Sequence, residues 1–234
     1  KGDRFEILAS AIPAMIAKIP IAHLNGGELT EGLIDDPIRH SLTKMSQIHF
    51  VACEEYRQRV IQLGENPEYV YKVGGVGIDG INEFNLLSKA NLEKSLNFNF
   101  GKKNLLITFH PLTLEDDKTN NQIKELLKSL RLLKNTNMIF TMPNADTNSR
   151  SIRILIEEFV RENPETTRVF KSLGQQKYLS CLKYVDAIVG NSSSGISEAP
   201  SFRKGTINIG DRQKGRVFAS SVICADPNEN SINE

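Results

Sequence analysis

The feature that most constrains the fold is an alternation of short apolar runs with longer amphipathic segments along almost the whole chain. Strands that are joined by crossover helices give this pattern, and such strands form parallel sheets. The sequence therefore predicts an α/β protein built from doubly wound, Rossmann-like units. The predicted strands are 20–24, 48–52, 69–73, 104–109, 138–142, 167–170, 186–189 and 205–209. The predicted helices are 5–17, 38–46, 54–63, 118–133, 148–162 and 175–182.

The length of 234 residues allows one large domain or two modest ones, since a typical domain has roughly 100 to 150 residues. The stretch 82–103 is rich in Asn and Lys and only weakly periodic, which is typical of a linker that contains a helical piece. We therefore predict one domain at residues 1–90 and a second at residues 91–234. The chain starts at Lys1 with what resembles the end of a strand, so we expect the first domain to be incomplete here.

The charge balance argues against nucleic acid and anionic membranes as partners. Lys and Arg number 29 and Asp and Glu number 28, so the chain has no global basic field. Any anion must therefore be bound at a local site. The apolar stretch 7–24 is interrupted by Pro13, Lys18 and Pro20, which leaves it short of the ~20 apolar residues that a membrane span needs.

The cysteines indicate a reducing compartment. Cys53, Cys181 and Cys224 are widely spaced and form no Cys-x-x-Cys pattern, so neither a disulfide framework nor a zinc site is predicted. We expect a cytoplasmic protein without a metal.

The segment Gly190-Asn-Ser-Ser-Ser-Gly195 follows a predicted strand and precedes a short helical piece. A turn of this kind offers backbone N–H groups, hydroxyl donors and a helix N-terminus to a phosphate. It is neither a Walker loop nor a dinucleotide-binding Gly-x-Gly-x-x-Gly motif, and a plain helix cap is the alternative. Glu198 lies one turn into the helix, where a carboxylate can accept hydrogen bonds from ribose hydroxyls or interact with the helix dipole.

His110 stands at the end of the predicted strand 104–109 and is followed by Pro111, which fixes the local turn. Ligands of open α/β sheets bind beyond the carboxyl ends of the strands. A histidine at that place suits an acid, a base or a phosphate contact. A structural histidine is the alternative.

Carboxylates gather near the start of the chain. Asp3 occupies the cap position of the first predicted helix, and capping alone would explain it. The glycine-rich loop 25–36 carries four more: Glu28, Glu31, Asp35 and Asp36. Such loops are often merely solvated, and Asp35 or Asp36 can cap the helix that contains Pro37. Several carboxylates in one domain and a phosphate cradle in the other nevertheless suit chemistry on a sugar.

Five motifs in this order resemble the hydrolysing UDP-N-acetylglucosamine 2-epimerases of sialic-acid synthesis, and the match runs over nearly the whole chain. They are Gly2-Asp-Arg-Phe-Glu6, His23-Leu-Asn-Gly-Gly-Glu28, Ile34-Asp-Asp-Pro-Ile-Arg-His40, His110-Pro-Leu-Thr113 and Gly190-Asn-Ser-Ser-Ser-Gly195 with Glu198-Ala-Pro200. The chain is also similar to a sister group that acts on UDP-2,4-diacetamido-2,4,6-trideoxy sugars on the route to legionaminic acid. The resemblance implies a GT-B-like fold, in which two Rossmann-like domains face a cleft. It further implies that the C-terminal domain holds UDP and the N-terminal domain presents acid and base groups to the sugar.

The resemblance also implies functions for single residues. The family's catalytic positions fall on Asp3, Asp35 and His110, and its UDP contacts fall on Ser192, Ser193 and Glu198. Arg212 and Arg216 are additional candidates for pyrophosphate or cleft contacts. Many relatives have a catalytic Glu where this chain has Asn25, and an amide cannot accept a proton at neutral pH. Either Glu28 or Asp36 then takes that function, or the chemistry is tuned to a different sugar.

The implied reaction needs no redox cofactor and no metal. The hydrogen at C2 of a 2-acetamido sugar is not next to a carbonyl, so deprotonation to a free carbanion is unfavourable. Loss of UDP from C1 as C2 is deprotonated gives a 2-acetamidoglucal instead. Water then adds at C1 and a proton adds at C2 from the other face. This route requires a base, an acid and a site that stabilises the leaving diphosphate.

Three alternatives share parts of this pattern. A GT-B glycosyltransferase would have the same fold and the same UDP cradle, and a non-hydrolysing epimerase would return a UDP-sugar. A UDP-sugar-binding regulatory protein, or a degenerate homologue, is suggested by Asn25. We expect a UDP-sugar as the ligand and a homo-oligomer, either a dimer or a tetramer, as the assembly.

Overall fold

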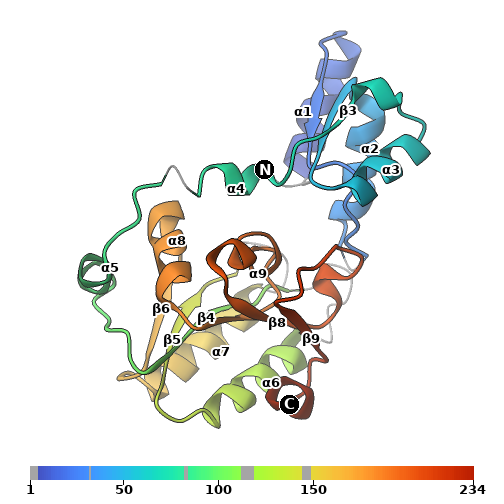
Figure 1. Ribbon diagram of the computed structural model, residues 1–234. Helices are drawn as coiled ribbons and strands as arrows, with labels where there is room; N and C mark the ends of the chain where they lie inside the picture. Colours follow the sequence, from blue (N-terminus) through green and yellow to red (C-terminus); the bar gives the residue numbers. More distant parts are fainter. Residues whose placement is uncertain (1–4, 32, 82–83, 112–118, 144–148) are drawn as a thin grey trace. The chain divides into compact units, whose positions relative to one another are not determined.

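The structure is a computed structural model that describes residues 5–31, 33–81, 84–111, 119–143 and 149–234 (Figure 1). The chain forms two compact units. The first comprises Lys1–Gly80 and Lys214–Arg216, and the second comprises Ile81–Gln213 and Val217–Glu234. The main chain thus passes from one unit to the other after Gly80. The functions assigned above to the two predicted domains stay predictions.

The first unit contains a small parallel sheet in the order β1-β2-β3. Its core is formed by Val51, Tyr56, Val60 and Val70. Apolar side chains at Tyr56 and Val60 are four positions apart and so lie on one face of their helix. The elements are α1 (Phe5–Ile16), β1 (Ala22–Leu24), α2 (Asp35–Met45), β2 (Ile48–Val51), α3 (Glu54–Gln62), η1 (Pro67–Tyr69), β3 (Val70–Lys72) and α4 (Val76–Asp79).

The second unit contains a larger sheet in the order β6-β5-β4-β7-β8-β9, in which all neighbours are parallel. Its first elements are α5 (Lys89–Leu96), β4 (Lys103–Thr108), α6 (Thr119–Arg131), β5 (Thr136–Thr141), α7 (Ser149–Glu162), β6 (Thr167–Phe170) and α8 (Gly174–Tyr184). They are followed by β7 (Ala187–Gly190), α9 (Ser194–Ser197), η2 (Ala199–Phe202), β8 (Gly205–Ile209), η3 (Asp211–Gln213), β9 (Val222–Ala225) and α10 (Glu229–Asn233). Parallel sheets in both units confirm the predicted α/β class.

Helices cover the larger sheet on both faces. Figure 1 shows α6 and α7 on one face and α8 on the other. Ile107 and Phe109 belong to the core cluster that contains the apolar residues of α6 and α7. Side chains alternate along a strand, so Leu106 and Thr108 point to the face that α8 covers. The hydrophobic pattern of β4 therefore decides which of its polar residues reach the α8 side.

Every predicted strand overlaps a strand of the structure, but β9 was not predicted. This edge strand reads Val-Ile-Cys-Ala, and Ile223 in it is 67% exposed. A short, half-exposed edge strand carries little of the apolar signal on which sequence prediction depends. α10 was missed for a similar reason, since it is short and polar and starts from an Asn228 cap. Among the described residues, no helix combines the length and the apolar character that a bilayer crossing requires.

Candidate active site in the second unit

The strand order of the larger sheet reverses between β4 and β7. The chain runs outward from β4 through β5 to β6, returns to β7 beside β4, and continues through β8 to β9. Thr108 at the end of β4 lies opposite Gly190 at the end of β7. Ligands of open parallel sheets bind beyond the carboxyl ends of the strands at such a reversal. His110 and the serine-rich segment follow these two strand ends and are therefore neighbours.

A pocket of about 360 Å³ lies at this edge of the sheet, a size that suits a small ligand. Hydroxyl-bearing residues are frequent in its described lining, which also includes one lysine. The lining residues are Thr108, His110, Thr141, Met142, Lys171, Ser172, Leu173, Gly174, Gln175, Tyr178, Ser192 and Ser194. Hydroxyl donors and a cation favour an anionic ligand.

Gly190 brings the serine-rich segment close to β4. Its φ is +136°, which side chains rarely allow, and a Cβ atom there would overlap the carbonyl oxygen of Thr108. Glycine is therefore required at this position. The close approach places Ser192 and Ser194 in the pocket lining.

Bonds within the turn occupy some of the N–H groups of the segment after Gly190, and the phosphate cradle stays a prediction. The N–H groups of Gly195, Ile196 and Ser197 donate to carbonyl oxygens of Ser192 and Ser193 within the turn. α9 has only four residues, so its dipole is small. Ser192 and Ser194 both belong to the pocket lining, and the hydroxyl of Ser194 is buried beside Tyr178.

Two of the predicted UDP contacts lie beside this lining. Ser193 precedes α9 and makes no side-chain capping bond. Glu198 follows α9 and is partly buried near Tyr178. Neither belongs to the described pocket lining, and their assignment to UDP stays a prediction.

His110 is 8% exposed. Burial, together with the positive charge of Arg212, lowers the pKa of its imidazole from 6.5 to about 3. The ring is therefore neutral at pH 7. In that state one ring nitrogen can accept a proton or a hydrogen bond, and the other can donate one.

Asn191 connects His110 to Arg212, and sequence reasoning did not single it out. Its side-chain oxygen accepts from the backbone N–H of His110 at 2.7 Å. Its side-chain nitrogen donates to the backbone carbonyl oxygen of His110 at 2.9 Å. Its own carbonyl oxygen accepts from Arg212 at 3.0 Å and from Gln213 at 2.8 Å. The sequence signal that could have revealed it is its place directly after a buried strand and before the serines, where a polar side chain needs a hydrogen-bond partner.

Tyr178 of α8 is a second residue that sequence reasoning missed. Its ring belongs to the pocket lining, while burial raises the pKa of its hydroxyl to about 12. The hydroxyl therefore keeps its proton at neutral pH. Ser194 and Thr108 are its polar neighbours.

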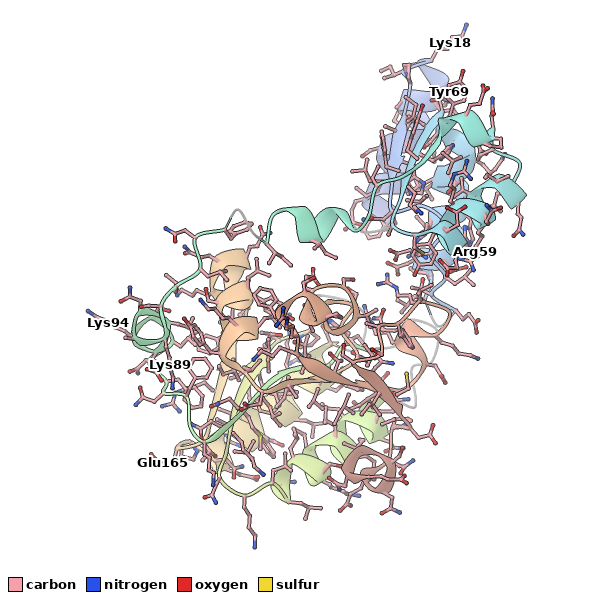
Figure 2. All side chains as sticks on the ribbon, in the orientation of Figure 1. Lys18, Arg59, Tyr69, Lys89, Lys94 and Glu165 are labelled. Atoms are coloured by element: carbon pink, nitrogen blue, oxygen red, sulfur yellow. The ribbon has the colours of Figure 1, made fainter. Side chains whose placement is uncertain are left out.

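The predicted catalytic carboxylates belong to the first unit. Glu28 pairs with Arg216 at 2.7 Å. The buried Arg39 donates to the carbonyl oxygen of Glu28 at 3.0 Å, and Arg59 of α3, labelled in Figure 2, donates to the carbonyl oxygen of Gly27. Arginines thus hold the loop 25–36 in place.

The remaining carboxylates of the loop separate into two kinds. Asp36 accepts the N–H of Thr30 at 2.6 Å and lies 3.5 Å from Arg39, so it organises the loop. Asp35 is the first residue of α2, and the cap position is occupied by Ile34. The capping alternative for Asp35 and Asp36 is therefore wrong. Asp3 lies outside the described residues.

Asn25 has a left-handed backbone with φ of +61°, and its N–H donates to the carbonyl oxygen of Phe50 at 2.8 Å. Asn adopts this conformation several-fold more often than most residues. The backbone thus supplies a physical reason for Asn at position 25. Among the described residues, no group of three or more His, Cys, Asp or Glu side chains is arranged to hold a metal ion.

Curated relatives share much of the sequence. A protein of Campylobacter jejuni named GDP/UDP-N,N'-diacetylbacillosamine 2-epimerase (hydrolyzing) is 47% identical over 97% of this chain. The polysialic acid biosynthesis protein P7 of Escherichia coli is 43% identical over 99%. A UDP-N,N'-diacetylbacillosamine 2-epimerase (hydrolyzing) of Legionella pneumophila is 37% identical over 99%. The chain spans 59%, 59% and 60% of these three proteins.

A solved structure shows the same fold. The UDP-GlcNAc 2-epimerase of Methanocaldococcus jannaschii, in complex with UDP-GlcNAc and UDP, matches with a TM-score of 0.81 at 17% identity. The match covers 99% of this chain and 65% of that one, and it confirms the GT-B-like fold class. The sequence profile of the family described as UDP-N-acetylglucosamine 2-epimerase matches residues 1–234. The profile and these relatives confirm the resemblance, and the chain belongs to the UDP-N-acetylglucosamine 2-epimerase family.

Proposed function

We propose that the protein carrying this chain is a hydrolysing 2-epimerase for a UDP-linked 2,4-diacetamido-2,4,6-trideoxy sugar, UDP-N,N'-diacetylbacillosamine. The observation that carries this proposal is the 47% identity with the Campylobacter enzyme, whose name gives N,N'-diacetylbacillosamine linked to GDP or UDP. The Legionella relative bears a similar name at 37% identity. A Neisseria meningitidis relative named UDP-N-acetylglucosamine 2-epimerase is 33% identical. UDP-N-acetylglucosamine, which the motifs first indicated, thus becomes the alternative substrate.

The pocket of the second unit is the proposed site for the nucleotide diphosphate. Ser192 and Ser194 belong to the pocket lining, which supports a hydroxyl contact from Ser192 to a phosphate oxygen, and Arg212 supplies positive charge near His110. Donors and cations of this kind stabilise the charge that develops on a leaving diphosphate. Ser193 and Glu198 complete the proposed set, with Glu198 on the ribose hydroxyls.

The proposed chemistry proceeds in two steps. A base removes the proton from C2 while the bond between C1 and the diphosphate oxygen breaks, which releases UDP and leaves a glycal. Water then adds at C1, and an acid delivers a proton to C2 from the opposite face. His110 is a further candidate for proton transfer, and its imidazole is neutral in the free protein because its pKa is lowered to about 3. Asp3 and Asp35 are the proposed partners in proton transfer.

Glu28 and Arg216 have a different place in the proposal. Their carboxylate and guanidinium are 2.7 Å apart, so neither group is available by itself as long as the pair persists. We assign them to the architecture of the sugar-side loop. Arg216 would contact pyrophosphate only after release of Glu28.

Product analysis with two donors tests the function. The intact protein is incubated with UDP-N,N'-diacetylbacillosamine and, separately, with UDP-N-acetylglucosamine in D₂O and in ¹⁸O-labelled water. We expect faster UDP release from the diacetamido donor, deuterium at C2 of the free sugar, and ¹⁸O at its C1 at short times. Faster release from UDP-N-acetylglucosamine would select the alternative substrate. A product without deuterium at C2 would indicate a glycosyltransferase or a simple hydrolase.

A further inference from the structure

The side chain of Asn191 is bonded to the backbone of one residue only among the described contacts. Its oxygen accepts from the backbone N–H of His110 at 2.7 Å, and its nitrogen donates to the backbone carbonyl oxygen of the same residue at 2.9 Å. The residue is 1% exposed, so water does not compete for these bonds. A pair of bonds to one residue fixes both the position and the orientation of its backbone.

The place of His110 along the chain explains why such a contact is needed. The pairing of β4 with β5 and β7 ends at Thr108. Beyond that residue the chain loses its ladder partners while it is still buried, and buried backbone groups without partners are costly. A side-chain amide carries one acceptor and a donor group on a short stem, as a peptide does. Asn191 thus continues the ladder for His110.

The side chain and the backbone of Asn191 bond to different residues. Its side chain bonds to His110, whereas its backbone carbonyl accepts from Arg212 at 3.0 Å and from Gln213 at 2.8 Å. Its backbone N–H donates to the carbonyl oxygen of Thr108 at 3.1 Å. A substitution of the side chain therefore removes the bonds to His110 and leaves the groups that bond to Arg212 in the chain.

We propose that Asn191 is a positioning residue, whose side chain holds His110 in the geometry that the epimerase reaction requires. This inference rests on the proposed function. Asn191 acts through His110 and does not touch the sugar. A displacement of about 1 Å at a reacting group can lower a rate ~100-fold, so loss of two backbone bonds is sufficient to matter.

Charged and titratable groups near His110 come from several elements. Arg212 of η3 acts on the imidazole directly. Lys171 after β6 and Tyr178 of α8 line the same pocket. None of them is bonded to the Asn191 side chain in the described contacts, so a change in its amide leaves their chemistry unaltered.

A double-mutant cycle separates positioning from a general structural effect. Asn191→Ala and His110→Ala should each lower UDP release by the intact protein ~100-fold. If Asn191 acts through His110, the double variant should lie within about twofold of His110→Ala, the scatter expected for measurements of this kind. If the rate loss of the double variant equals the product of the two single losses, the proposal is overturned. UDP affinity of Asn191→Ala, measured by calorimetry, should also stay within about twofold, because the carbonyl that holds Arg212 remains.

Asn208 provides a matched control. It is 2% exposed in β8 of the same sheet, and its side chain bonds to Gly210 and Cys224 and not to His110. Asn208→Ala also removes a buried amide. Its loss of rate should multiply with that of His110→Ala, as independent sites do. If the coupling between Asn208→Ala and His110→Ala equals the coupling between Asn191→Ala and His110→Ala, Asn191 has no specific connection to His110.

An NMR titration tests the positioning without any sugar. The His110 signal, assigned by its loss in His110→Ala, should show no titration above pH 5 in the wild type, because burial lowers the pKa to about 3. In Asn191→Ala, a loosened backbone admits water, and the midpoint should move toward 6.5. An unchanged midpoint would contradict the proposal. Asn191→Leu, which keeps an approximate shape but loses both the acceptor and the donor without adding a charge, replaces Asn191→Ala should that variant not fold, with a rise expected again.

The two failures are distinguishable. If the wild type releases UDP from no donor, the proposed function fails, and the titration still decides whether Asn191 holds His110. If UDP is released but the cycle is multiplicative, the function stands and the positioning proposal fails.

Discussion

The carboxylate of Glu28 lies 2.7 Å from the guanidinium of Arg216, and the two side chains are only 17% and 15% exposed. The pair joins the loop 25–36 to the segment Lys214–Arg216, which belongs to the first unit although its neighbours along the chain belong to the second. Lys214 and Glu31 join the same two segments at 3.2 Å, but these side chains are 60% and 50% exposed. The protein thus contains a shielded ion pair and an exposed one side by side.

Glu28→Gln or Arg216→Met should destabilise the first unit by about 1 to 3 kcal/mol, because each leaves a shielded charge without its partner. The double variant should lose less than the sum of the two, since neither charge remains. The corresponding changes at the exposed pair, Glu31→Gln and Lys214→Met, should cost no more than about 0.5 kcal/mol each. Urea denaturation of all variants gives these energies. Equal losses at both pairs would show that shielding does not determine their strength.

Gly190→Ala should destabilise the second unit by about 3 kcal/mol or more, because steric overlap adds to backbone strain. The added Cβ would overlap the carbonyl oxygen of Thr108. Gly174→Ala is the matched control, since φ there is +66° but no atom lies within 4 Å of the added Cβ. Its expected cost is ~1 kcal/mol, from the left-handed backbone alone. Similar thermal unfolding shifts for the two variants would refute the close approach of the strands.

The larger elements could be predicted because their apolar residues have clear periods. Ile123, Leu127 and Leu130 recur at helical spacing along α6 and are buried in the core, and β6 and β8 have the predicted bounds. Edge strand β9 could not be predicted, because Ile223 faces away from the core and weakens the pattern.

The site was predictable only in part. The residues after β4 and β7 were expected to carry chemistry, and the structure places His110 and Ser192 in one pocket. The function of Asn191 depends on a contact between positions far apart in the sequence, and no local pattern reveals such a contact. The pairing of Glu28 with Arg216 likewise joins positions far apart in the sequence, so no local pattern reveals it. The assignments of Asp3, Asp35 and Glu198, and the oligomeric state, stay predictions.

Ser192→Ala should weaken UDP binding by about 1 to 3 kcal/mol, because a phosphate then loses a hydroxyl donor. Ser192 belongs to the pocket lining, whereas Ser193 does not, and the hydroxyl of Ser194 is buried. Ser193→Ala and Ser194→Ala should therefore have smaller effects. Calorimetric titration with UDP measures all three affinities. A larger loss at Ser193 than at Ser192 would mean that the segment turns differently when UDP is bound.

Acid should destabilise the second unit through His110. The folded protein binds a proton on this ring only near pH 3, whereas the ordinary value is 6.5, so between these values the unfolded chain binds more protons. Stability is therefore unaffected above pH 6.5 and falls as the pH is lowered toward 3, by up to ~1.4 kcal/mol per pH unit. His110→Gln removes this proton uptake. Denaturation midpoints at pH 7, 5.5 and 4 should fall less in the variant than in the wild type.

His49 in the first unit is the control for this effect. Burial also lowers the pKa of its imidazole, but Glu65, 3.1 Å away, opposes the shift by favouring the charged ring. The acid sensitivity that His49 contributes therefore has the same sign and should be smaller. His49→Gln should consequently recover less stability at pH 4 than His110→Gln. If the two variants and the wild type lose stability in parallel from pH 7 to 4, the pKa of His110 is the same in the folded and the unfolded chain, and burial does not hold the ring neutral.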